Sequence, residues 1–141
     1  MTQISFKCTV QAPFERLWQT LMSEIEKPEN FSKSILRSEV LERFNDGLLR
    51  VVSVPDADVR ERITWTFDEK KVVSTLVGHP QLSGQIIKTV EAGAEDTWIM
   101  STTLNWQSID EGVDQMVKRK VEGFVQECHD HIKAASENMT P

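Results

Sequence analysis

The chain has 141 residues, of which 39% are apolar and 27% are charged, and its formal net charge is −6 at pH 7. This length predicts one domain with a core of its own, and the composition is ordinary for a globular protein. The negative charge argues against nucleic acid as a partner, because phosphate backbones are bound by basic surfaces. No apolar run approaches the roughly 20 residues of a membrane-spanning helix.

The first residues and the cysteines bear on the cellular compartment. Residues 1–7 lack the basic start and the apolar stretch of a signal peptide. Cys8 and Cys128 lie far apart in the chain and show no metal-ligand spacing, so we expect two free thiols in a reducing environment. The sequence therefore predicts a cytoplasmic protein.

The N-terminal part predicts one strand and two helices. Residues 3–10 alternate between apolar and polar side chains, which indicates a half-buried strand. From Pro13, a residue suited to the first helical position, apolar side chains recur every three or four positions and predict an amphipathic helix. That helix ends before Pro28, and residues 28–31 can form a second, very short helix.

From residue 34 the apolar period changes to two. Asn45-Asp46-Gly47 is a strong hairpin signal, because Asp-Gly tolerates positive φ, and residues 55–58 are a second turn candidate. Short connections at this spacing predict an antiparallel meander, since parallel strands need long crossovers. The expected strands are residues 34–44, 48–54, 59–67, 71–78, 85–92 and 97–106.

The last predicted element is a helix over residues 109–137 with a single apolar stripe. At 1.5 Å per residue it would be about 43 Å long, enough to cross a whole sheet face. The sequence thus predicts an α+β fold in which a curved antiparallel sheet of about seven strands wraps around the C-terminal helix. Such a sheet encloses a space that is a candidate ligand pocket. We expect a single domain at residues 1–137 and a frayed tail at 138–141.

A family resemblance rests on the order of the predicted elements, which covers nearly the whole chain, and on several short segments between residues 12 and 63. They are Ala12-Pro13-Phe14-Glu15-Arg16-Leu17-Trp18, Pro28-Glu29-Asn30-Phe31, Ile35, Val40-Leu41, Leu49-Arg50-Val51-Val52 and Val59-Arg60-Glu61-Arg62-Ile63. The chain resembles the Bet v 1/START (SRPBCC) superfamily, and within it the AtaL-like subgroup. The resemblance implies a helix-grip fold with a cavity. It implies no particular reaction, because the superfamily hosts transport, cyclisation, hydrolysis and pure binding on one scaffold.

Glu61 is the sharpest candidate for a functional residue. Along residues 59–67 it is in phase with Ile63 and Trp65, so it is expected to point inward with an apolar face. An isolated buried carboxylate is costly, and it should therefore protonate or find a partner.

Arg50 offers that partner. If Val54 lies opposite Val59 across the predicted turn, Arg50 and Glu61 become diagonal neighbours within side-chain reach. Two interpretations stay open, a polar anchor for a ligand and a self-satisfied structural ion pair. The other face of the strand at residues 48–54 could also be the inner one, which would place Arg50 in solvent.

Several apolar side chains are candidates for the wall of the pocket. Trp98 and Met100 lie on the expected inner face of residues 97–106, and Phe124 belongs to the stripe of the long helix. With Ile63 and Trp65 they would contact the body of a flat or lipid-like ligand, and plain core packing is the alternative.

Three functions are compatible with these residues. The leading hypothesis is binding of a small, largely apolar or amphipathic molecule whose polar end Arg50 and Glu61 orient. The second is a cyclase- or dehydratase-like enzyme of aromatic polyketide-like metabolism, with Glu61 as general acid or base. The third is an interaction module with a filled core. No metal, P-loop or dinucleotide motif occurs in the sequence, so no cofactor or metal is expected, and both a monomer and a homodimer remain possible.

Overall fold

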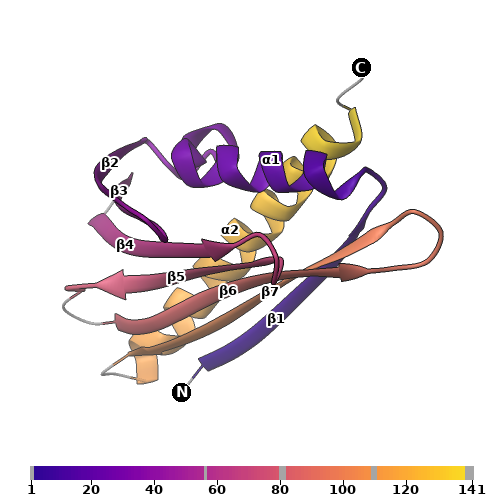
Figure 1. Ribbon diagram of the computed structural model, residues 1–141. Coiled ribbons are helices and arrows are strands. Elements are labelled where there is room, and N and C mark those ends of the chain that lie inside the picture. The colour runs from indigo at the N-terminus through magenta and orange to yellow at the C-terminus, as the bar shows by residue number, and fades with distance from the viewer. Residues whose placement is uncertain (1, 56, 80–81, 109–110, 139–141) are drawn as a thin grey trace.

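The structure is a computed structural model that describes residues 2–55, 57–79, 82–108 and 111–138 (Figure 1). Side chains are described in these ranges except at residues 2–4, 108, 111–118, 120, 121, 124 and 138. In chain order, the described elements are β1 (Thr2–Val10), α1 (Phe14–Glu26), the 3-10 helix η1 (Pro28–Asn30), β2 (Arg37–Phe44), β3 (Gly47–Val54), β4 (Ala57–Thr66), β5 (Lys71–Val77), β6 (Leu82–Ala92), β7 (Trp98–Ser108) and α2 (Glu111–Asn138).

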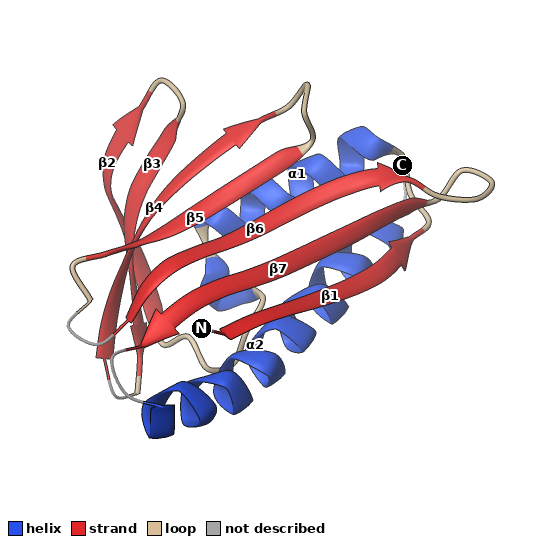
Figure 2. Cartoon of the chain, turned by 90° about the horizontal axis from the view of Figure 1, so that it is seen from below, coloured by secondary structure: helices blue, strands red, loops and turns tan. Residues whose placement is uncertain are grey.

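The strands of the described ranges form one seven-stranded sheet in the order β1-β7-β6-β5-β4-β3-β2, and all neighbours are antiparallel. Strands β2 to β7 follow one another as a meander, and β1 joins the far edge beside β7. Both long helices lie on one side of the sheet (Figure 2). The described part of α2 contacts α1, β1 and β7, so the curved sheet wraps around the C-terminal helix and the predicted α+β helix-grip fold is confirmed.

The core lies between the sheet and the two helices. Leu17, Leu21 and Ile25 recur at steps of four along α1, which places them on one face, and each is at most 3% exposed. They pack into one cluster with side chains from the sheet and from α2, among them Met100 and Ile132. None of the described helices combines the length and hydropathy that a membrane crossing requires.

The start of α1 differs slightly from the expectation. Pro13 is the residue before the first helical turn, with φ −58° and ψ 146°, rather than the first helical residue itself. Its carbonyl oxygen accepts the backbone N–H bonds of Arg16 at 3.1 Å and Leu17 at 3.2 Å. The proline therefore ends the preceding extended segment and opens the helix at the same time.

The connection between β3 and β4 corrects the predicted register. Val54 pairs with Ala57, so β4 begins at Ala57, within the predicted turn at 55–58, instead of at residue 59. The tighter hairpin slides the pairing by two positions and places Arg50 directly opposite Glu61 rather than diagonal to it. Because the side-chain period of a strand is two, this slide leaves every side chain on its expected face.

Two glycines explain further differences. The hairpin at Asn45-Asp46-Gly47 is present, but Gly47 is not among the positive-φ residues; a Cβ there would lie 1.8 Å from the carbonyl oxygen of Ile63. Close approach of two strands requires this glycine. Strand β6 begins at Leu82, before the predicted residue 85, because Gly84 continues the strand with a φ of +124° that other residues rarely adopt.

Candidate functional site

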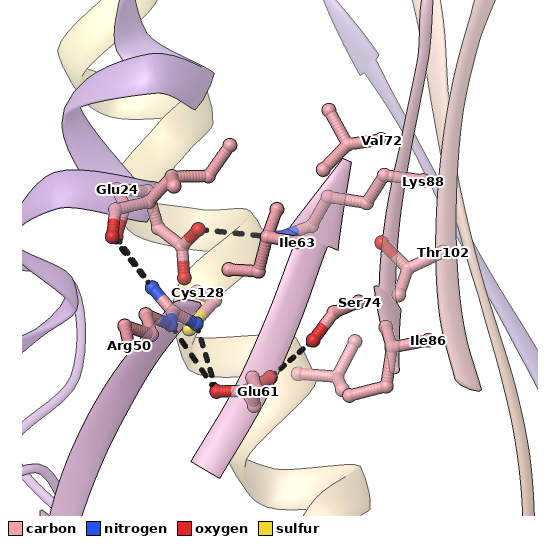
Figure 3. Close-up of a pocket in the computed structure, with 12 residues that line it drawn as sticks. Glu24, Arg50, Glu61, Ile63, Val72, Ser74, Ile86, Lys88, Thr102 and Cys128 are labelled. Atoms are coloured by element: carbon pink, nitrogen blue, oxygen red, sulfur yellow. Dashed lines mark hydrogen bonds and ion pairs between the residues drawn. The ribbon is translucent and has the colours of Figure 1, made fainter. Parts of the chain in front are cut away.

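A cavity of about 40 Å³ lies between the sheet, α1 and α2 (Figure 3). Its polar lining consists of Glu24, Arg50, Glu61, Ser74, Lys88 and Thr102. Its apolar lining, with one thiol, consists of Ile25, Ile63, Val72, Ile86, Val125 and Cys128. The cavity therefore combines an apolar wall with charged groups that come from α1, β3, β4 and β6.

Arg50 and Glu61 face each other inside the protein. Arg50 is 5% exposed and Glu61 is 8% exposed, and they occupy opposite positions on β3 and β4. The Nε and Nη2 atoms of Arg50 donate to Oε1 of Glu61 at 3.2 and 3.1 Å. The second carboxylate oxygen, Oε2, accepts a hydrogen bond from the hydroxyl of Ser74 on β5. Donors from two neighbouring strands thus hold the carboxylate of Glu61.

Arg50 also caps the C-terminal end of α1. Its Nη1 atom donates to the backbone carbonyl oxygens of Glu24 at 3.2 Å and Ile25 at 2.9 Å. These carbonyls belong to the last turn of α1, where the helix itself supplies no donors and no basic side chain of its own is present. A cation at this end also interacts favourably with the helix dipole.

The pKa of Arg50 is raised above its ordinary value. Burial disfavours the charged guanidinium, but the carboxylates of Glu61 and Glu24 and the hydrogen bond to Glu61 outweigh it. The site therefore contains a permanently charged arginine that is tied to both the sheet and the helix.

A second pair of opposite charges lies across the cavity. The Nζ atom of Lys88 is 3.8 Å from Oε2 of Glu24, and the two side chains are 14% and 7% exposed. This distance is longer than a hydrogen bond. Glu24 and Lys88 are thus buried together without bonding directly to each other.

His129 lies beside the cavity on α2. Its Nε2 atom is 2.6 Å from the Thr102 hydroxyl oxygen, and the imidazole is 2% exposed and meets Phe6 edge to face. Burial, followed by the charge of Lys88, lowers the pKa of His129 to about 4. The imidazole is therefore neutral near pH 7 and serves as a hydrogen-bonding partner inside the core.

Cys128 offers no reactive thiolate. Burial raises the pKa of its thiol to about 12, and both cysteines are free. Among the described residues, no three side chains of the types that bind metals gather at one place.

The structure brings only some of the predicted site residues to the cavity. Arg50, Glu61 and Ile63 line it. Met100 and Trp65 pack in the core instead, and Trp98 packs against Phe14 with ring centroids 5.2 Å apart. The predicted contact of Phe124 falls on a side chain outside the described ones.

Two of the four charged groups, Glu24 and Lys88, were not among the predicted site residues. Glu24 follows Leu17 and Leu21 on the apolar face of α1, and Lys88 is in phase with Ile86 and Val90 on β6. The argument that identified Glu61, a charge in phase with an apolar face, applies equally to both. The periodicity of the sequence could therefore have found them.

We predict that Arg50→Met lowers the free energy of unfolding by about 3–5 kcal/mol, because it leaves the Glu61 carboxylate buried alone. The double change Arg50→Met/Glu61→Leu should recover part of the loss. Full recovery is not expected, because the two helix carbonyls also lose their donor, at a cost of about 1–3 kcal/mol. Urea denaturation of the single and double variants measures these terms.

The exposed pair Arg43–Glu26, with a 2.6 Å ion pair, is the matched control. The cycle Arg43→Met/Glu26→Leu should show a coupling below about 1 kcal/mol. A coupling between Arg50 and Glu61 below about 0.3 kcal/mol would contradict the interaction described here.

We also predict a pH dependence that arises from His129. In the unfolded chain its pKa returns to about 6.5, so the unfolded state binds the proton first as the pH falls, and stability is lost between about pH 6.5 and 4. Urea denaturation should show about 2 kcal/mol less stability at pH 5 than at pH 7 from this residue. His129→Gln should lack that part of the loss, whereas the half-exposed His131→Gln should retain it. Equal pH profiles for His129→Gln and the wild type would show that burial of the imidazole is not the cause.

Comparison with known proteins places this chain in a family. Residues 9–138 match the family model described as acetylaranotin biosynthesis cluster protein L. Among the curated proteins, none matches the sequence.

Solved structures share the fold. The aromatase/cyclase Zhui from Streptomyces sp. R1128 matches with a TM-score of 0.84 and 13% identity, over 96% of this chain and 93% of that chain. Norcoclaurine synthase from Thalictrum flavum matches with a TM-score of 0.79 and 10% identity, over 98% of this chain and 87% of that chain. A START superfamily protein from Mycobacterium smegmatis matches with a TM-score of 0.74 and 14% identity, over 98% of this chain and 99% of that chain. With its START-like helix-grip fold, the chain belongs to the family of acetylaranotin biosynthesis cluster protein L.

Proposed function

We propose that the protein binds a small, largely apolar molecule with one polar end between the sheet and α2. The observation that carries this proposal is the cavity where Glu24, Arg50, Glu61 and Lys88 meet a wall of aliphatic side chains. Burying charged groups is costly. Four buried charged groups in one place therefore indicate a role beyond packing, because apolar side chains would fill a core at a lower cost in free energy. A cavity with apolar walls and a few convergent polar groups is typical of small-molecule sites.

The size of the cavity implies that binding is coupled to opening. A volume of about 40 Å³ suits a water molecule, whereas pockets for drug-sized molecules have roughly 300–1,000 Å³. On the inner faces of β5 and β6, Ser74 and Ile86 keep part of their surface exposed, and the Lys88 side chain is 14% exposed. The main contacts of the described part of α2 are with α1, β1 and β7, so we place the opening between α2 and strands β5 and β6, which are not among these contacts.

An enzyme is the second candidate function. Glu61 lines the cavity, and its Oε2 atom accepts a hydrogen bond from the Ser74 hydroxyl, which gives a carboxylate and a hydroxyl within reach of a bound molecule. The likeness to an aromatase/cyclase supports a cyclase- or dehydratase-like reaction with Glu61 as acid or base. The bonds from Arg50 and Ser74 hold the Glu61 carboxylate in place, which favours a structural role for Glu61 over proton transfer.

The proposal predicts that 4-nitroanisole, a small neutral aromatic probe, binds to the protein and raises its melting temperature with increasing concentration. Ile86→Ala shortens a side chain of the apolar wall and so enlarges the cavity. This variant should therefore bind the probe several-fold more tightly than the wild type. Leu36→Ala, at a side chain that is 64% exposed, is the control and should leave the affinity unchanged. Isothermal titration calorimetry measures all three affinities. Absence of binding to both the wild type and Ile86→Ala would contradict the proposal and favour a module with a filled core.

Native mass spectrometry of protein purified from its own host separates a binder from an enzyme. A small molecule that co-purifies and stays chemically unchanged on incubation with fresh protein indicates binding alone. Conversion of that molecule, abolished by Glu61→Gln in a folded protein, indicates the enzyme.

A further inference from the structure

We infer that Glu24 and Lys88 form a subsite for the protic oxygen of a neutral phenolic or enolic group. This inference rests on the proposed function and specifies the chemistry of the ligand's polar end. It also assigns the ligand contact to residues other than Arg50 and Glu61, the pair that the sequence singled out.

The hydrogen bonds of Arg50 and Glu61 leave that pair little capacity for a ligand. Four of the five N–H bonds of Arg50 are used, two on Glu61 and two on the carbonyls of Glu24 and Ile25. Both oxygens of Glu61 are occupied, by the guanidinium and by the Ser74 hydroxyl. This pair is a closed unit that holds the structure around the cavity.

Glu24 and Lys88 are in the opposite condition. Within the described part of the chain, the only direct polar contact of their charged atoms is the 3.8 Å approach between Lys88 Nζ and Glu24 Oε2. An ammonium has three donors and a carboxylate about four acceptor positions. Both groups line the cavity, so their hydrogen-bonding capacity is directed into it (Figure 3).

The distance between them suits a single bridging oxygen. One oxygen atom can lie at about 2.8 Å from both charged groups when these are 3.8 Å apart. Such an oxygen accepts from the ammonium of Lys88 and donates its proton to the carboxylate of Glu24. A hydroxyl group meets both requirements, whereas an ether oxygen cannot donate and a carboxylate cannot donate either.

The charges around the cavity favour a neutral group. The described lining carries two cations, Arg50 and Lys88, and two carboxylates, Glu24 and Glu61. From α2, Cys128 and His129 face the same region and are uncharged near pH 7. A ligand carboxylate would place an uncompensated negative charge beside Glu24. A protonated ligand amine would place an uncompensated positive charge beside Lys88. A phenol or enol keeps the balance, and its acidic hydroxyl suits an ammonium and a carboxylate together.

Three matched probes test the subsite in the wild-type protein. They are 4-nitrophenol, which donates and accepts, 4-nitroanisole, which only accepts, and 4-nitrobenzoate, which is an anion. At a pH where the phenol is neutral, 4-nitrophenol should bind about tenfold more tightly than either of the others, because only it forms both charge-assisted hydrogen bonds. Equal affinity for all three probes would overturn the inference.

The ionisation of bound 4-nitrophenol gives a second, signed readout. The chain contains no tyrosine, so the probe carries the only phenolic hydroxyl in the sample, and its absorbance reports its ionisation. Glu24→Gln removes a negative neighbour and should increase the acid dissociation constant of the bound probe about tenfold, and Lys88→Met should decrease it by a similar factor. Glu91→Gln and Lys7→Met, which change exposed side chains, should leave it unchanged.

The outcomes separate this inference from the proposed function. If none of the three probes binds, the proposed function fails and the subsite fails with it. If the probes bind but show no preference, and both cavity variants behave as the exposed controls do, only the subsite is wrong. Increased affinity of Glu24→Gln for 4-nitrobenzoate would independently support a site in which Glu24 repels anions.

Discussion

One buried arginine connects the sheet of this protein to its first helix. Arg50 lies at the point where β3, β4 and the C-terminal end of α1 meet, and it donates to a carboxylate on the sheet and to two carbonyls of the helix. A guanidinium suits this role because its N–H groups diverge in a plane and it stays charged when buried. Without those contacts, the helix end and Glu61 would both be desolvated without partners.

The same arginine places the groups that are available to a ligand. Its bond to the backbone carbonyl of Glu24 fixes the residue whose carboxylate faces Lys88. The Arg50–Glu61 pair, whose hydrogen-bonding groups are used within the protein, thus positions the Glu24–Lys88 pair, whose groups are available to a ligand. Rigid binding sites commonly divide positioning and ligand contact between residues in this way. The aliphatic wall completes a site whose polar end is defined and whose volume depends on the separation of α2 from the sheet.

Most of the fold could be predicted from the sequence, because two periods dominate it. The step of three and four residues in α1 and the step of two in the strands follow directly from helix and strand geometry. The register between β3 and β4 was less accessible, since both a two-residue and a four-residue turn leave the same faces inward. The predicted strand at 85–92 began too late, because the φ of +124° with which Gly84 continues β6 cannot be known before the strand is seen.

The site was predicted only in part, for a related physical reason. Periodicity reveals which residues point inward, and by this criterion Glu61 was correctly expected to point inward, whereas for Arg50 both faces of its strand had remained open. It does not reveal which inward-facing residues share one cavity, because that depends on how the helices cross the sheet. Met100 and Trp98 therefore pack elsewhere, whereas Glu24 on α1 and Lys88 on β6 meet although they are far apart in sequence.

A crystal structure of the protein with 4-bromophenol tests the central claim most directly, since the anomalous signal of bromine locates the ring without ambiguity. We predict the ring against Ile63, Val72 and Ile86, with the phenol oxygen within hydrogen-bond distance of both the Glu24 carboxylate and the Lys88 ammonium. The Arg50–Glu61 pair should be unchanged in that complex. A phenol bound away from the cavity, or one that inserts between Arg50 and Glu61, would contradict the account.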